Sequence, residues 1–173
     1  MSTIENHPQF FTTTILEWRH ILKADAIKEI IINSLKFLVD NKRVIVYSFV
    51  IMPNHVHIIW KIADNHTRSN VQRDFLKYTS QQIKFYLKKN NPEALREFRV
   101  ESADREYQIW ERNPLSWDIY NMKTFMQKLL YIHANPVHEK WSLCQAPEEY
   151  FYSSARFYSM NQDDWGFLTH YKD

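Results

Sequence analysis

Two neighbouring runs of strand-forming residues constrain the fold of this chain more than any other feature. The runs 44–51 and 55–62 are rich in β-branched and aromatic side chains, and only residues 52–54 separate them. A separation this short predicts two strands joined by a tight turn. Within the second run, His55 and His57 stand two positions apart. Because alternate side chains of a strand point to the same face, both imidazoles are expected to project side by side.

The segments around these two strands predict the rest of the architecture. We expect a strand at 10–18, a helix at 25–40 and a second helix at 69–88, from their strand-forming composition or helical spacing of apolar residues. The run 107–111 is expected to supply a fourth strand. This order predicts an α+β fold, a ferredoxin-like sandwich in which helices cover one face of an antiparallel sheet.

The C-terminal third is predicted to be mainly helical. A long helix is expected at 117–134, ending where Pro136 blocks its continuation. A short helix is expected at 148–158, followed by an irregular end. A chain of 173 residues fits one domain, so we expect a single domain over 1–173 with residues 159–173 as a C-terminal tail.

Composition excludes several classes of protein. Hydrophobic residues make up 45% of the chain and aromatic residues 16%, which argues against disorder. A single cysteine, Cys144, can form neither an intramolecular disulfide nor a cysteine-based zinc site. The chain begins without a signal-peptide pattern and has no apolar run of roughly 20 residues, so we expect a cytoplasmic protein with no membrane partner. The net charge of +2 is too small to indicate nucleic-acid binding by itself.

The histidine pair is a candidate metal site. Two imidazoles on one face, completed by an amide oxygen or water, suit a divalent ion. In the alternative interpretation, one ring is a hydrogen-bonded core residue and the other faces solvent. The face that a strand gives to both His55 and His57 argues against that alternative. The six other histidines lack such spacing and are expected at the surface or in packing contacts.

The helix at 117–134 carries a second candidate. At about 100° per residue, its apolar side chains from Met122 to Leu129 cluster on one side. Tyr131 falls nearly opposite, and Asn135 follows one turn later on the same side. Tyr131 is either an ordinary surface tyrosine or a nucleophile, with the carbonyl oxygen of Asn135 able to reach the metal.

Three short motifs together suggest a family. They are His-hydrophobic-His at 55–57 within the segment 52–57, a tyrosine helix ending in Asn-Pro-Val at 131–137, and Tyr-x-x-Ser-Ser-Ala at 150–155. In content and order they resemble the HUH single-strand DNA transposases of the IS200/IS605 type, specifically the REP-associated tyrosine transposase branch. The resemblance extends from the first strand to about Tyr158.

The resemblance implies a ferredoxin-like core with a C-terminal tyrosine-bearing helix. His55, His57 and Asn135 would hold a divalent metal ion, Mg or Mn, and Tyr131 would be the catalytic nucleophile. The implied activity is cleavage and rejoining of single-stranded DNA through a 5′-phosphotyrosine intermediate, as in DNA transposition or REP-hairpin processing. The implied partner is hairpin-forming single-stranded DNA, and a homodimer is compatible with the resemblance.

The second helix offers candidate DNA contacts. Arg73, Lys77 and Lys84 are interleaved with aromatic residues, a pattern suited to phosphates and stacked bases, although a solvated helix face is an equal alternative.

The sequence bears on two other functional classes. Histidine-triad hydrolases need a longer alternation of histidines, and Ile59 stands where the next would fall. A non-catalytic nucleic-acid-binding module would use Tyr47, Phe49 or Trp60 as stacking platforms.

Overall fold

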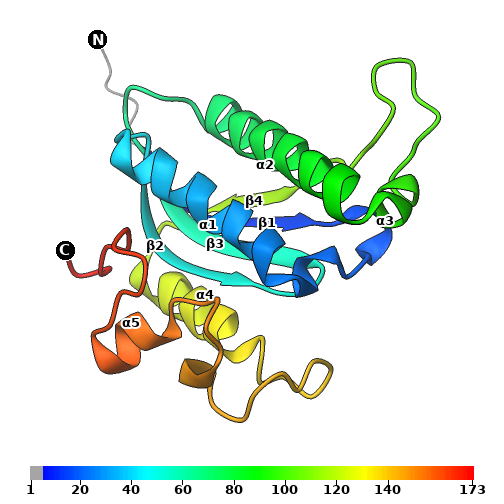
Figure 1. Ribbon diagram of the computed structural model, residues 1–173. Helices are drawn as coiled ribbons and strands as arrows, with labels where there is room; N and C mark the ends of the chain where they lie inside the picture. The colour runs from blue at the N-terminus through cyan, green and yellow to red at the C-terminus, as the bar shows by residue number, and fades with distance from the viewer. Residues whose placement is uncertain (1–5) are drawn as a thin grey trace.

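The computed structural model describes residues 6–173 and has a four-stranded antiparallel sheet at its centre (Figure 1). The strands lie in the order β2-β3-β1-β4. This is the strand order of a ferredoxin-like fold, so the predicted α+β class is confirmed. The strands are β1 (Pro8–Thr14), β2 (Val44–Ile51), β3 (His55–Ile62) and β4 (Leu115–Asp118).

Helices cover both faces of this sheet. The helices α1 (Asp25–Asp40) and α2 (Arg68–Asn90) pack side by side on one face, followed by the short α3 (Pro92–Arg96). The helix α4 (Met122–Ala134) lies on the opposite face, with α5 (Ala155–Met160) beside it (Figure 1). No helix in the described part of the chain is long and apolar enough to cross a membrane.

The alternation of side chains along β3 separates two cores. Val56, Ile58 and Trp60 are fully buried in the larger core, which also contains the apolar faces of α1 and α2. Ile59, on the other face, belongs to a smaller core beneath α4. His55 and His57 share that second face, and this places both imidazoles on the side of the sheet that carries the tyrosine helix.

Several predicted boundaries were wrong. The run 107–111 forms only isolated bridges, and the fourth strand lies at 115–118 instead. Trp110 is buried and its indole Nε1–H donates to the Thr79 hydroxyl at 2.9 Å, so this run fills the core and meets the sheet only at the end of β1, where the N–H of Glu111 donates to the carbonyl of Thr14 at 2.7 Å. The first strand ends at Thr14.

The helix predicted from 117 begins only at Met122. Asn121 precedes it and its side chain accepts the backbone N–H of Thr124 at 2.8 Å, which is an N-cap. In place of a helix at 148–158, the chain forms a 3-10 turn, η3 (Pro147–Glu149), and the short α5.

The C-terminal segment packs against the open edge of β2. Thr169 donates its N–H to the carbonyl of Val46 at 2.9 Å, and Leu168 bridges Val46 in parallel. Phe167 is buried in the larger core against Phe49. The segment predicted to be a tail therefore covers an edge strand that would otherwise be open to pairing.

Candidate functional site

A cavity of about 360 Å³ lies between β1, β3 and the C-terminal end of α4. All four residues that the sequence predicts for metal binding and nucleophilic attack line it: His55, His57, Tyr131 and Asn135. The two imidazoles come from one strand, and the phenol and the carboxamide come from one helix end. The docking of α4 on the sheet therefore brings the two predicted halves of the site together.

His57 is held by the strand beside it. In the register between β1 and β3, Thr12 lies directly opposite His57, and its hydroxyl lies 2.7 Å from the imidazole Nδ1. The other ring nitrogen, Nε2, is buried and has no hydrogen-bond partner among the described residues. A buried nitrogen without a partner costs free energy unless something binds it. If Nδ1–H donates to Thr12, the Nε2 lone pair is available to a metal ion.

His55 is oriented by its neighbour in sequence. Its Nδ1 lies 2.6 Å from the side-chain carbonyl oxygen of Asn54. Because a carbonyl oxygen only accepts hydrogen bonds, Nδ1 carries the proton and Nε2 keeps its lone pair. The centroids of the two imidazole rings are 4.6 Å apart. His55 thus offers an unprotonated nitrogen close to His57, which offers a second one when its Nδ1–H donates to Thr12.

Burial keeps both imidazoles neutral. Desolvation lowers the pKa of His55 to about 4, with a further lowering by the Lys140 charge, and a side-chain hydrogen bond to Asn135 opposes the shift. Desolvation also lowers the pKa of His57 to about 3, assisted by His55 and Lys128. At neutral pH both rings are therefore in the form that ligates metals.

Tyr131 combines accessibility with proximity to the histidines. Its ring centroid is 5.3 Å from that of His57 and 6.3 Å from that of Phe10. The residue is nevertheless 53% exposed, so a polymer as large as a DNA strand can approach it. Asn135 follows the last residue of α4 and is buried.

The donor set fits a divalent ion. Two neutral imidazole nitrogens and a carboxamide oxygen form a mixed nitrogen and oxygen set with room for further ligands. The described residues contain no cluster of three or more His, Cys, Asp or Glu side chains, so Asn135 would have to complete this set.

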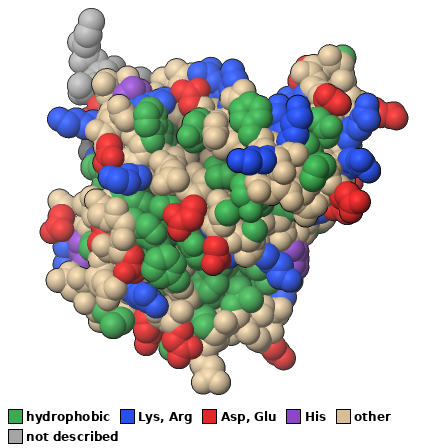
Figure 2. Space-filling model, viewed as in Figure 1, with side chains coloured by type: hydrophobic (Ala, Val, Ile, Leu, Met, Phe, Trp, Pro, Cys, Tyr) green, Lys and Arg blue, Asp and Glu red, His purple; other side chains and the backbone are tan. Residues whose placement is uncertain are grey.

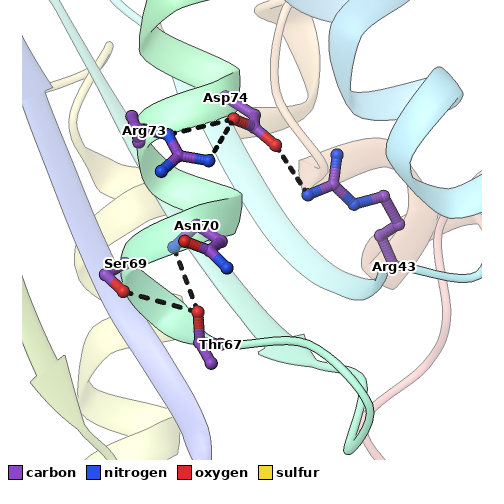
Figure 3. A network of polar contacts seen from close by, with 6 residues as sticks. All are labelled: Arg43, Thr67, Ser69, Asn70, Arg73 and Asp74. Atoms are coloured by element: carbon purple, nitrogen blue, oxygen red, sulfur yellow. Dashed lines mark hydrogen bonds and ion pairs between the residues drawn. The ribbon is translucent and has the colours of Figure 1, made fainter.

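The basic residues predicted to contact DNA do not line this cavity. Arg73, Lys77 and Lys84 line a separate groove of about 730 Å³ between α2 and residues 104–114. Arg73 pairs with Asp74, which also pairs with Arg43 (Figure 3). Among the described residues neither Lys77 nor Lys84 forms an ion pair. Figure 2 shows Lys and Arg side chains dispersed among acidic and hydrophobic ones on the face of α1 and α2.

Two of the three stacking platforms named for the alternative binding module are not available. Phe49 and Trp60 are 0% exposed and belong to the larger core. Tyr47 is partly buried and its ring packs edge-on against Phe125 of α4. The expectation was wrong for Phe49 and Trp60, because their strand positions face α1 and α2 rather than solvent.

Eight residues of the cavity wall were not predicted from the sequence, among them Thr12, Asn54, Lys140 and Trp141. Asn54 stands next to His55, so its orienting role had a sequence signal. Thr12 had none, because its contact with His57 depends on the pairing of strands 45 residues apart. Lys140 and Trp141 reach the cavity through turns after Pro136.

Comparisons with known proteins agree with this architecture. No protein-family model matches the chain, and no curated protein is similar to it in sequence. Among solved structures, the fold is shared with a REP-associated tyrosine transposase that was solved bound to a REP hairpin. That match has a TM-score of 0.66 and 16% identity and covers 100% of this chain and 92% of the other. It supports the resemblance to HUH transposases of the IS200/IS605 type at the level of the fold.

A second similar structure is a transposase described as putative, from Deinococcus radiodurans. Its TM-score is 0.48 with 11% identity, over 76% of this chain and 92% of the other.

Proposed function

We propose that this protein cleaves and rejoins single-stranded DNA, with Tyr131 as the nucleophile and a divalent ion, Mg²⁺ or Mn²⁺, at His55, His57 and Asn135. The observation that carries the proposal is the buried, unpartnered Nε2 of His57 beside the exposed ring of Tyr131. A metal ligand and a nucleophile in one cavity are what phosphoryl transfer requires. The shared fold with a hairpin-bound transposase supports hairpin-forming DNA as the substrate.

The proposed reaction exchanges one phosphodiester bond for another. The phenol oxygen of Tyr131 loses its proton and forms a bond to a backbone phosphorus, while the bond from that phosphorus to the 3′ oxygen breaks. The leaving oxygen takes up a proton and becomes a free 3′-OH, and the 5′ phosphate stays on the tyrosine. A bound divalent ion would polarise the phosphoryl oxygens.

Reversal of this step on a different 3′-OH would rejoin the strand. No second nucleophile is required, because the phosphotyrosine conserves the energy of the broken bond. Transposition or the processing of REP hairpins would both use this pair of reactions. Lys128 lies near the site, with its Nζ 4.8 Å from the centroid of the Phe10 ring, and its positive charge favours a phosphate there.

The test is trapping of the covalent intermediate. Hairpin-bearing single-stranded DNA is incubated with the protein and Mn²⁺ or Mg²⁺, and a denaturation-resistant protein–DNA adduct is sought. We expect the native protein to form the adduct, and we expect EDTA or Tyr131→Phe to abolish it, because the variant has no phenol oxygen.

Tyr78→Phe is the matched control. Tyr78 lies on α2, on the other side of the sheet, and is 48% exposed, which is similar to Tyr131. This variant should form the adduct at the native rate. An adduct that persists in Tyr131→Phe would show that another residue is the nucleophile. If nucleic acid is bound but never cleaved by the native protein, a non-catalytic binding module is the better description.

A further inference from the structure

A second cavity, of about 560 Å³, adjoins the candidate site. The two cavities share Trp18, Asn54, Lys140 and Trp141, so they are parts of one continuous depression. Lys23 lies on the wall of the second cavity. None of the described residues that line either cavity is acidic. The depression therefore offers aromatic surface and positive charge directly beside the histidine pair.

Trp18 is exposed in a backbone conformation that residues with a Cβ rarely adopt. The residue is 68% exposed, although an indole is large and apolar. Its φ is 53° and that of Glu17 is 55°, so two successive residues lie in the left-handed region. Such strain persists only where the surrounding structure enforces it, and it is concentrated at functional sites.

Three separate segments fix this strained turn. The N–H of Glu17 donates to the Glu111 carboxylate at 2.6 Å. Arg19 pairs with Glu17 at 2.8 Å and with Glu97 at 2.9 Å. The carbonyl of Trp18 accepts the Asn54 side-chain amide at 3.4 Å. The indole is thus presented to solvent by a turn that is tied down on several sides.

Asn54 connects this turn to the candidate metal site. Its amide nitrogen donates to Trp18 and its carbonyl oxygen accepts from His55. On the other wall, the Trp141 ring lies 5.8 Å from the His55 ring, and the Lys140 Nζ lies 5.5 Å from the Trp141 ring. Two indoles therefore line the same depression, and one of them, that of Trp141, lies beside a predicted metal ligand.

We propose that Trp18 and Trp141 bind an unpaired DNA base of the nucleotide next to the reacting phosphate, and that Lys23 and Lys140 contact the neighbouring phosphates. This inference rests on the function proposed above. Indole faces stack on any base, and the absence of acidic wall residues suits a polyanion. A base inside a duplex is already stacked on both sides, so the site selects single-stranded DNA.

The test measures binding separately from cleavage. Tyr131→Phe protein is titrated against a short fluorescein-labelled single-stranded DNA of randomised sequence, and against an abasic strand of equal length. Introducing Trp18→Ala into the Tyr131→Phe protein should weaken binding of the randomised DNA by about 5- to 100-fold, as expected for loss of one stacked base. Binding of the abasic strand should remain nearly unchanged. Phe37→Ala is the matched control, since Phe37 is 57% exposed on α1 and lines neither cavity. The affinity of this variant for the randomised DNA should not change.

Two further variants separate recognition from folding. Trp18→Gly should not lower the melting temperature, because glycine adopts a positive φ without strain, yet it should bind as weakly as Trp18→Ala. Trp18→Phe should recover most of the affinity. Equal binding by Trp18→Ala and Phe37→Ala, or an equal loss for abasic and base-containing strands, would overturn the inference.

The outcome also distinguishes this inference from the proposed catalysis. A protein that binds DNA bases through Trp18 but never forms the tyrosine adduct would overturn the catalytic proposal alone. A protein that forms the adduct while Trp18→Ala binds DNA normally would overturn the base site alone.

Discussion

At the scale of single residues, each imidazole has a neighbour that orients it. Asn54 accepts from Nδ1 of His55 and leaves its Nε2 unprotonated, and the Thr12 hydroxyl contacts Nδ1 of His57, whose Nε2 is unprotonated when Nδ1–H donates to Thr12. Partners of this kind set the tautomer and orientation of a metal-ligating histidine. The two neighbours would therefore orient the histidines toward the proposed metal ion, although neither is predicted to touch it.

Thr12→Val should weaken metal binding while the fold is retained. Valine has nearly the shape of threonine but cannot hydrogen-bond His57, and loss of such a partner lowers metal affinity by about 10- to 100-fold. Titration calorimetry with Mn²⁺ measures the change. Thr13→Val is the control, because Thr13 faces the other side of β1 and its hydroxyl has no hydrogen-bond partner among the described residues. Equal Mn²⁺ affinity in both variants would contradict a metal role for His57.

At the scale of elements, one serine anchors the tyrosine helix to the sheet. The hydroxyl of Ser154, within the Tyr-x-x-Ser-Ser-Ala motif, accepts the N–H of Phe49 in β2 at 3.0 Å. It also lies 2.8 Å from Nε2 of His133 in α4 and 2.9 Å from the hydroxyl of Ser48. The motif thus joins α4 to β2. Its contact on α4 is His133, which lies two residues after Tyr131.

Ser154→Ala should lower the free energy of unfolding by about 1–3 kcal/mol, because it leaves buried donors and acceptors without a partner. Urea unfolding followed by circular dichroism provides the measurement. Ser159→Ala serves as the comparison, since that residue is exposed near the end of α5 and such changes usually stay within about 0.5 kcal/mol. Similar unfolding midpoints for the two variants would mean that the Ser154 network does not stabilise the fold.

At the scale of the whole molecule, the predicted chemistry and the predicted basic helix lie on opposite faces of the sheet. The histidines and Tyr131 face α4, whereas Lys77 and Lys84 project from α2. A DNA molecule that touches both would have to pass around an edge of the sheet, and β4 forms the edge opposite to the one that the C-terminal segment covers. Lys77 and Lys84 are therefore predicted to contact phosphates of a distant part of a long substrate, such as a hairpin stem.

Replacement of both lysines, Lys77→Gln with Lys84→Gln, should reduce affinity for hairpin DNA and lower the slope of log affinity against log salt by about 1 to 2. Fluorescence anisotropy over a range of salt concentrations measures both quantities. Lys36→Gln on α1 is the matched control, because Lys36 already pairs with Asp40. An unchanged salt slope in the double variant would leave Lys77 and Lys84 as a solvated helix face.

The sequence by itself determined which residues share a face of a strand or helix. Through three motifs, it also determined the four candidate residues for metal binding and nucleophilic attack. Those inferences depend on local periodicity, which is a property of each strand or helix alone. The position of β4 and the contact of Thr12 with His57 were decided only by the tertiary structure. The tertiary structure also decided that the C-terminal segment covers β2 and that the turn at Trp18 is strained. Strand register and helix docking depend on packing between distant segments, and no local pattern contains that information.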